Sequence, residues 1–349
     1  MNAQIALLLG QDGVTNGAIY ALLALSIVLV FTVTRVLLVP QGEFVTFGAM
    51  TMAGLQAGQP VRLAWLLLAL AVLRLVWRLW ALRPGLRADP QPPLSVWDAA
   101  GPVYALVLWG IADRVPGQNW PMALQVLFTL ALVVPLGPWL YDLCFRPIAA
   151  AHGLVLLIVS IALHVVLVGL ALWMFGAEGA RTLPFSEEGL DLGLLNVNAQ
   201  SLWVLAATLA LMVGLFVFFE RTLRGKALRA TAVSRLGAQL MGISPTAAGR
   251  TCFALAAFIG GLSGTLIAPL TTLYYDSGFL ISLKGFVGAV VGGLVSFPVG
   301  ALGALSVGLV EAYSTFWASS YKEVIVFTLI LPFLLWRSLT SKHHEEDRA

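Results

Sequence analysis

Charged residues are scarce in this sequence. Of its 349 residues only 11% are charged, while 59% are hydrophobic, and the mean hydropathy is +0.91. This excludes a soluble globular domain, in which about 25% of residues are charged. At about 20 apolar residues per crossing, the chain has room for roughly ten membrane spans. Its net charge of +3 is explained by membrane topology, so we expect a lipid bilayer as its environment and no nucleic-acid partner.

Cysteine and histidine are also rare. Cys144 and Cys252 both fall near predicted cytoplasmic ends of apolar segments. Thiols stay reduced there, so we expect no disulfide. His343 and His344 stand together in the polar tail 338–349, where a solvated chain end explains them better than a metal site. The sequence therefore predicts neither a metal nor a cofactor.

Catalytic motifs are absent as well. Gly225-Lys226 is followed by alanine, and Glu220 stands where a phosphate-binding loop requires a glycine. Gly261-Leu262-Ser263-Gly264 matches the G-x-S-G string of rhomboid-type intramembrane serine proteases, whose activating histidine lies on a later helix. Here His164 precedes Ser263, and the next histidine is in the polar tail. We expect no enzymatic activity, so any ATP hydrolysis must come from partner subunits.

Apolar segments alternate with polar loops along the whole chain. Several are shorter than a full crossing, which predicts tilted or broken helices. We therefore expect an all-α polytopic membrane protein with roughly 9–11 transmembrane segments, in a single domain over residues 1–349. The apolar segments are 14–34, 43–59, 63–82, 97–113, 121–143, 153–175, 200–220, 248–268, 284–298, 301–318 and 321–337.

A cationic window orients the chain. Residues 221–250 contain six cations and no acid, and positive charge stays on the cytoplasmic side of a membrane. Alternating from this loop places the N-terminus outside and the C-terminus inside, with fourteen cations inside and five outside. Lys284 counts as outside, at the start of its segment, whereas Arg74 falls within a helix. The six cations are Arg221, Arg224, Lys226, Arg229, Arg235 and Arg250.

Glycines four residues apart recur in two segments, at Gly260 and Gly264 and at Gly288 and Gly292. Small residues at this spacing let helix backbones approach closely in lipid, so helix packing is their expected role. Pro298 divides the second glycine-rich run into two short helices. Broken helices are tolerated at membrane depth mainly where they are buried in protein or line a cavity. The pattern therefore indicates a transporter or a channel.

Five motifs, in this order, carry a resemblance to a known family. Each is weak alone, but together they resemble the permeases of branched-chain amino-acid ABC importers, most closely the LivH-like type, which is related to the LivM-like and urea permeases. The similarity runs from about residue 13 to 337 and leaves out roughly 60–120. The motifs are NGAIYALLALSIVLVF at 16–31, QGEFVTFGA at 41–49, FRPI at 145–148, RGKALRATA…GI at 224–243 and VGGLVSFP…GLVEA at 291–312.

The resemblance implies a type II-like permease fold in a bacterial inner membrane. Its partners would be a second permease subunit (a sister or a copy of itself), two cytoplasmic ATP-binding-cassette ATPase subunits and a periplasmic solute-binding protein. Residues 222–244 would be the coupling helix that docks on the ATPase; serving only as a topological anchor is the alternative for this loop. Its candidate coupling residues are Arg224, Gly225, Lys226, Arg229, Ala230, Gly242 and Ile243.

The chain departs from the family pattern in two places. Leu38 stands where the family commonly has asparagine, and 60–120 resembles an insertion of two helices, joined by the Pro-rich linker 83–95. Both departures leave the solute open: besides branched-chain amino acids, the sequence leaves aromatic acids, amides and urea as alternatives. A self-sufficient secondary transporter or channel is the alternative function, but the few charges within apolar segments argue against an ion-coupling site.

Ionisable groups inside apolar segments cost about 2.5–3.5 kcal/mol each, so each one needs an explanation. Glu43 either caps the start of its helix or belongs to a transport path. Glu311 needs a donor on another helix, and His164 is either a satisfied core histidine or a proton relay. Ordinary hydrogen bonding between helices is the alternative for the polar residues nearby. The candidates for a translocation path are Asn16, Tyr20, Gln41, Glu43, Thr46 and Glu311.

Overall fold

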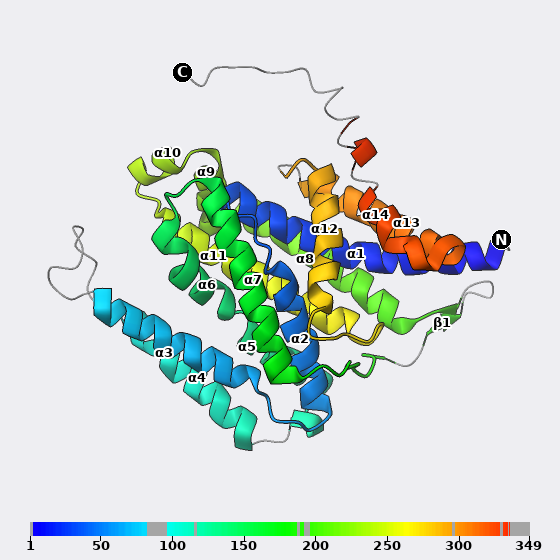
Figure 1. The fold of residues 1–349 in the computed structure, drawn as a ribbon, viewed down its shortest axis with the longest axis horizontal. Helices are drawn as coiled ribbons and strands as arrows, with labels where there is room; N and C mark the ends of the chain where they lie inside the picture. Colours follow the sequence, from blue (N-terminus) through cyan, green and yellow to red (C-terminus); the bar gives the residue numbers. More distant parts are fainter. Residues whose placement is uncertain are drawn as a thin grey trace.

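The computed structural model describes residues 3–81, 96–114, 117–186, 189–191, 196–294, 297–328, 331–333 and 335. Within these residues the chain is a bundle of helices, and its only strands are one antiparallel pair of two residues each (Figure 1). The whole linker 83–95 and the whole tail 338–349, with its two histidines, lie outside the described residues.

The elements follow the apolar segments closely. The helices of ten residues or more are α1 (Ala3–Thr34), α2 (Gln41–Gln56), α3 (Leu63–Ala81), α4 (Val96–Arg114), α5 (Met122–Val133), α7 (Gly153–Phe175), α8 (Ala199–Arg221), α9 (Leu223–Val233), α11 (Pro245–Ile267), α12 (Ser277–Val291) and α13 (Phe297–Ala318). The shorter elements are η1 (Gly117–Asn119), α6 (Leu136–Leu140), the π-helix η2 (Tyr141–Phe145), η3 (Arg146–Ile148), β1 (Leu190–Asp191), β2 (Asn196–Val197), α10 (Arg235–Leu240), η4 (Ser319–Tyr321) and α14 (Lys322–Thr328).

Seven stretches of the described residues are long and apolar enough to cross a membrane, and a shorter apolar helix, α12, accompanies them. The fold is therefore that of an all-α polytopic membrane protein. The count is lower than the eleven apolar segments of the sequence at four places. The last two segments fall within one candidate span, Phe297–Phe333, α2 and α12 have only 16 and 15 residues, and α4 is not among the candidate spans.

The longest helix, α1, forms the centre of the bundle, with 89% of its most apolar window buried. It lies antiparallel beside α13 (Figure 1). A methyl group on Gly13 or Gly17 would lie 2.9 Å from the Cα atom of Leu309 or Leu305. Since lipid supplies no hydrophobic drive between helices, such close backbone contact is what holds them together.

The predicted role of the glycines in helix packing is visible at α11. Gly264 packs against the carbonyl of Val45 on α2, and Gly261 packs against Val133 on α5, with 3.1 Å between its added methyl and a valine methyl. Gly288 packs against Ala304, which brings α12 onto α13. Small residues thus join α2, α11, α12 and α13 into one close-packed unit.

The predicted break at Pro298 lies slightly earlier in the chain. After α12 the chain turns at Gly293 and Leu294, whose φ angles are 69° and 58°, and Pro298 lies in the first turn of α13. Proline is favoured there because the first helical N–H groups have no partner within the helix. Only α12 is short: α13 has 22 residues, so the expectation of two short helices was wrong for the second.

Residues 60–120 contain two helices, α3 and α4, which pack on each other at one side of the bundle (Figure 1). Trp65 and Trp109 meet edge to face with ring centroids 5.0 Å apart. Gly101 lies against Trp139, which joins the hairpin to α6. That this hairpin is an insertion into the family fold stays a prediction.

The close approach of α2 and α11 can be tested with a single methyl group. Gly264→Ala places that methyl against the Val45 carbonyl oxygen, and overpacking of this kind costs about 1–3 kcal/mol. We expect the variant to lose its folded, monodisperse form at a lower temperature when heated in detergent. Gly169→Ala on α7, where no atom lies within 4 Å of the added methyl, is the control. Equal melting of the two variants would contradict this packing.

Candidate functional site

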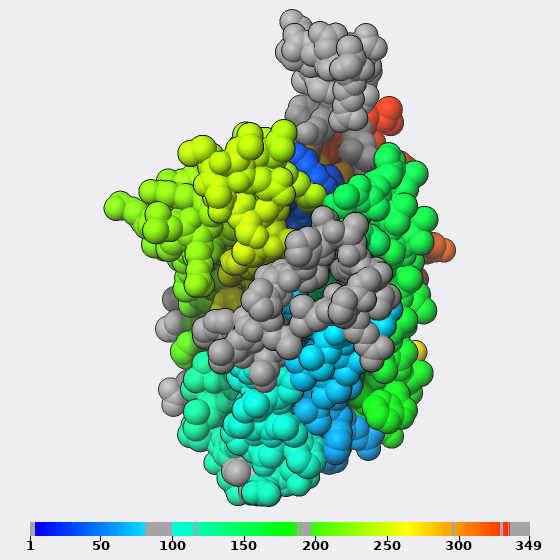
Figure 2. All heavy atoms as spheres, turned by 90° about the vertical axis from the view of Figure 1, so that its left-hand side faces the viewer, coloured from blue at the N-terminus to red at the C-terminus, as the bar shows by residue number. Residues whose placement is uncertain are grey.

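The basic window 221–250 projects from one end of the molecule. Figure 2 shows its lime and yellow residues standing out from the body. The structure corrects the expectation of one coupling helix over 222–244, because this segment holds two helices, α9 and α10. Ser234 separates them in an extended conformation (φ −150°, ψ 115°), and its hydroxyl accepts a hydrogen bond from the N–H of Gly237 (3.0 Å). Ser234 therefore ends α9 and caps α10.

The first predicted coupling residues divide into exposed and buried positions. Arg224 and Lys226 are exposed on α9, and Ala230 is half-buried. Arg229 is also exposed and forms an ion pair with Glu220 (2.6 Å). Gly225 is buried against the backbone of α8. We infer that Gly225 sets how closely α9 returns to α8, whereas Arg224 and Lys226 are exposed to solvent.

The last two predicted coupling residues end α10. Gly242 has a φ of 79°, a left-handed conformation that glycine adopts without strain. Its N–H donates to the Gln239 carbonyl, and the N–H of Ile243 donates to the Ala238 carbonyl (2.9 Å each). Helices commonly end at a glycine in this conformation, and Pro245 then starts α11.

Large apolar side chains are exposed beside these cations, and sequence analysis missed them. Between 67% and 87% of each is accessible. Contiguous exposed apolar side chains outside the membrane-spanning helices are typical of interaction surfaces. Their signal in the sequence was apolar residues within an otherwise basic loop. These residues, which we call the apolar knob, are Leu223, Val233, Leu236, Leu240 and Met241.

Arg235 connects the projecting helices to the membrane core. Its guanidinium donates to the carbonyls of Val33 (3.3 Å) and Thr34 at the end of α1, and to the carbonyl of Ala149 (3.4 Å). One side chain therefore joins α10 to the last turn of α1 and to the loop before α7. A displacement of α10 reaches the central helix of the bundle directly.

A second connection lies at the far end of the basic window. Asp142, in the π-helix η2, accepts from Arg250 at the start of α11 (2.6 Å) and from Arg74 on α3 (2.9 Å). The sequence placed Arg74 within a helix but offered no partner for it, and Asp142 was not among the predicted site residues. The bridge joins α11 to the α3–α4 hairpin.

The helices α2 and α12 both begin inside the bundle. Gln41, the first residue of α2, donates to the carbonyl of Ala256 (3.1 Å), which is the twelfth of the 23 residues of α11. Gly42 touches Gly278 in the first turn of α12, whose N–H donates to the Thr46 hydroxyl (3.1 Å). Two helix N-termini, each carrying partial positive charge, thus meet about halfway along their neighbours.

Glu43 lies at this junction and is 1% exposed. Its Oε1 atom is 2.6 Å from Nδ1 of His164, the twelfth of the 23 residues of α7. The His164 ring lies against that of Phe279, with centroids 4.5 Å apart. Oε2 of Glu43 is buried without a hydrogen-bond partner among the described residues. Glu43 makes no side-chain cap on α2; its partner is the histidine that the sequence left open.

Two cavities border α7, one at residues before His164 and one at residues after it along the helix. The inner cavity, of about 370 Å³, is lined by residues 37–39, Ile161 on α7 and Phe279 on α12. The outer cavity, of about 510 Å³, is lined by Met50 on α2 and by Met174 at the end of α7. The Glu43–His164 pair therefore lies between the two cavities along α7.

Comparison with known proteins identifies the class of this membrane protein. The family described as branched-chain amino acid transport system, permease component, matches residues 99–334 of the 349. The chain belongs to this permease family. The permease shares 27% identity with the high-affinity branched-chain amino acid transport system permease protein BraD of Pseudomonas aeruginosa, over 62% of this chain and 74% of BraD.

Two further relatives carry similar names. The LivH permease proteins of Salmonella typhimurium and Escherichia coli are 25% and 24% identical, over 67% of this chain and 77% of each relative. No solved structure matches the permease. Its relatives are transport subunits, which agrees with the expectation of no enzymatic activity. Among the described residues no group of three or more His, Cys, Asp or Glu is arranged to hold a metal ion.

The remaining path candidates of the permease form a separate cluster. Glu311 on α13 accepts from the Tyr20 hydroxyl of α1 (2.6 Å) and from Nζ of Lys284 on α12 (2.5 Å). Asn16 lies half-buried one turn before Tyr20. The predicted donor from another helix is thus present twice. Lys284 corrects the topology count: α12 begins at Ser277, so this lysine is buried in mid-helix and is not an outer-surface cation.

The buried pair can be tested by removing one partner and then both. Lys284→Met leaves the Glu311 carboxylate buried without its cation, a change that costs about 3–5 kcal/mol. Lys284→Met/Glu311→Gln removes both charges and keeps an acceptor for Tyr20. We expect the single variant to be markedly less heat-stable in detergent and the double variant to recover most of the loss. A double variant as unstable as the single one would contradict charge pairing as the cause.

Proposed function

We propose that this permease is the transmembrane subunit of an ATP-binding-cassette importer of branched-chain amino acids or a related small solute. It acts in a bacterial inner membrane, with its N-terminus in the periplasm and its C-terminus in the cytoplasm. The names of the curated relatives support the solute class. The observation that carries the importer assignment is the apolar knob, exposed among cations at one end of the bundle.

The proposed partners follow from what the chain has and lacks. A type II-like permease pairs with a second permease subunit, either a sister or a copy of itself. Two cytoplasmic ATPase subunits supply the energy, because the sequence contains no phosphate-binding loop. The apolar knob enters a groove of one ATPase, and Arg224 and Lys226 surround that contact. A periplasmic binding protein delivers the solute to the opposite end of the permease.

Transmission of the ATPase motion uses the two connections already described. When the ATPase subunits close, they displace α9 and α10 as one unit. Arg235 passes the displacement to α1, and Arg250 passes it through Asp142 to α3. Because α1 packs on α11, α12 and α13, its movement changes the junction of α2 and α12. Packed helices of this kind shift between discrete arrangements.

The solute path follows α7 past the Glu43–His164 pair, from the outer cavity beside α2 to the inner cavity beside α12. Glu43 and His164 close it between the outer and inner cavities, and Phe279 stacks on the histidine. Separating α2 from α7 breaks a buried polar pair, so the passage stays closed until the ATPase supplies work. Gln41 and Thr46 hold the helices at this point, while Tyr20 and Glu311 hold α1, α12 and α13 together away from the path.

A secondary transporter remains a second candidate function because of one observation. The buried Glu43–His164 pair has the chemistry of a proton site, and intramembrane ionisable groups are frequently functional. Proteoliposomes that contain the permease alone separate the two functions. Solute uptake driven by a proton gradient without ATPase subunits would support the secondary transporter and overturn the importer assignment.

The ATPase contact is tested at neighbouring positions of α10. Leu240→Glu places a charge in the apolar knob, and we expect the ATPase subunits to be lost when the complex is purified through a tag on the permease. Gln239→Glu adds the same charge at the adjacent exposed position and is the control. Retention of the ATPase by Leu240→Glu would contradict docking through the knob.

The transmission step is tested at Arg235. Arg235→Gln removes the donors to the carbonyls of α1 but leaves the apolar knob unchanged. We expect the ATPase subunits still to bind and to hydrolyse ATP, while solute uptake per ATP hydrolysed falls several-fold in proteoliposomes. Arg221→Gln, which removes an exposed cation from the end of α8, is the control. An unchanged ratio of uptake to hydrolysis in Arg235→Gln would contradict transmission through this side chain.

A further inference from the structure

The outer cavity combines an apolar wall with charges of both signs. It lies between the C-terminal half of α2, the last turn of α7 and the loop that follows α7, at the opposite end of α7 from α9 and α10 (Figure 1). Its volume is about 510 Å³, within the range of small-molecule sites. The apolar part is lined by Met50, Ala53, Met174 and Phe175, and the charged part by Arg62, Glu178 and Arg181.

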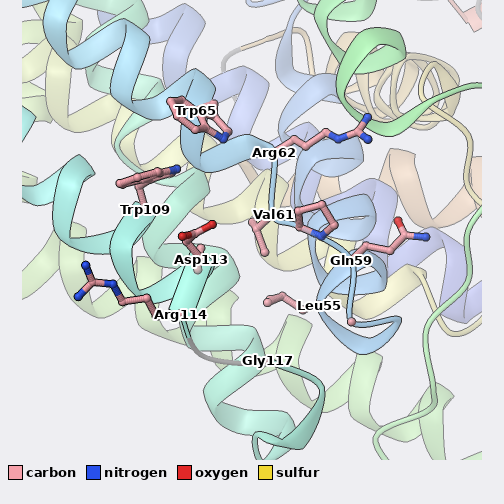
Figure 3. A pocket seen from close by; sticks show the side chains of 12 residues that line it. Leu55, Gln59, Val61, Arg62, Trp65, Trp109, Asp113, Arg114 and Gly117 are labelled. Carbon is pink, nitrogen blue, oxygen red and sulfur yellow. The ribbon is translucent and has the colours of Figure 1, made fainter.

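The two arginines are held in place by backbone carbonyls. Arg181 donates to the carbonyls of Pro269 (2.9 Å) and Leu270 (3.3 Å). Arg62 donates through one nitrogen to the carbonyl of Met174 (3.1 Å). Figure 3 shows Arg62 extending away from Trp65 and Trp109. Since a guanidinium has five N–H donors, each arginine keeps donors for a ligand.

The loop that carries Glu178 is held against the segment 272–274. The N–H and carbonyl of Ala180 are both bonded to Leu273 (2.8 and 3.0 Å), and Gly179 lies against Thr272 and Tyr274. Glu178 is exposed, and no described residue forms an ion pair with it. The cavity therefore has one carboxylate and two guanidinium groups in its lining, and the loop that carries the carboxylate is held in place by its backbone, which lowers the entropic cost of binding.

One buried polar group of this cavity also lacks a partner. Thr51, on the α2 wall, is 2% exposed. Its hydroxyl is buried with no hydrogen-bond partner among the described residues. A hydroxyl left in this way costs free energy that a bound ligand or water recovers. Thr51 lies two helical turns beyond Glu43 on α2, so a ligand at Thr51 is about 12 Å along the helix from the Glu43–His164 pair.

We propose that the outer cavity is a solute-binding site of the permease itself and that it takes a zwitterionic α-amino acid with an apolar side chain. Arg62 and Arg181 receive the carboxylate, Glu178 receives the ammonium group, and the methionines and Phe175 receive the side chain. This inference rests on the proposed function, since it names the class of solute that the path carries. A neutral amide or urea would pair with none of the three charges. An acyl chain has no charged group for them to bind.

The neighbouring cavity in Figure 3 provides a matched control. It has a volume of about 360 Å³ and lies between the end of α2 and the α3–α4 hairpin. Arg114 extends from it on the side away from Arg62 (Figure 3). The two cavities share residues 59–62, but Arg114 lines this one alone, so replacing it removes a cation from the permease without changing the lining of the outer cavity.

The test measures binding of radiolabelled L-leucine and L-phenylalanine to the full-length permease in nanodiscs without a binding protein. Competitors are leucinamide, which lacks the carboxylate, and 4-methylpentanoate, which lacks the ammonium group. We expect saturable binding of at least one amino acid and weak competition by both analogues. Glu178→Gln, an exposed isosteric change, should weaken amino-acid binding about tenfold or more, with little effect on binding of 4-methylpentanoate. Arg62→Gln should weaken binding of leucine and of 4-methylpentanoate alike, because both carry the carboxylate. Arg114→Gln should bind both molecules as tightly as the unaltered permease does.

Three results would overturn the site: no binding of either amino acid, equal competition by both analogues, or unaltered affinity in Glu178→Gln. Uptake by the permease with its ATPase subunits separates this proposal from the importer function. ATP-driven leucine uptake that is unchanged in Glu178→Gln refutes the site and leaves the importer standing. Leucine binding that requires Glu178 in a permease without ATP-driven uptake supports the site and refutes the importer.

Discussion

The need to satisfy every backbone polar group without water governs this structure, because α2 and α12 both begin inside the bundle. Their first N–H groups, and the extended chain that leads into α2, have no helical partners of their own. The protein supplies them from neighbouring helices: the Ser160 hydroxyl bonds both Val39 and Leu37, and Thr46 accepts from Gly278. Helices broken at mid-depth are possible only because the glycines let these donors and acceptors approach so closely.

The buried charges follow the same constraint. Glu43 meets His164, and Glu311 meets both Lys284 and Tyr20, so each carboxylate has a donor from a different helix. Pairs of this kind add little net stability over apolar packing, but losing one partner is costly, so they favour a single arrangement of helices. One pair lies between two cavities and the other lies among α1, α12 and α13. The first position suits a barrier across a path, and the second suits a fixed frame around it.

The projecting helices and the junction in the membrane are coupled through few contacts. Arg235 binds the end of α1, while the bridge from Arg250 through Asp142 to Arg74 reaches the α3–α4 hairpin. Charge-assisted hydrogen bonds are short and directional, which makes them suitable for transmitting a displacement from a mobile partner into a packed core. The side chains of the apolar knob, in contrast, are largely exposed, which is the observation behind the proposed ATPase contact.

The sequence by itself determined the class of protein, most helix boundaries and the basic projecting segment. It also determined the glycine contacts and the need of Glu311 for a donor on another helix. These features follow from hydropathy, charge and small-residue spacing, which are local properties. The sequence did not determine that Glu43 faces His164, 121 residues away, that Lys284 is buried, or that Asp142 joins two arginines. It also missed the separation of α9 from α10 at Ser234. Those facts were decided by the tertiary structure, because a side chain's partner in lipid depends on which helices lie side by side, and neither periodicity nor composition records that arrangement.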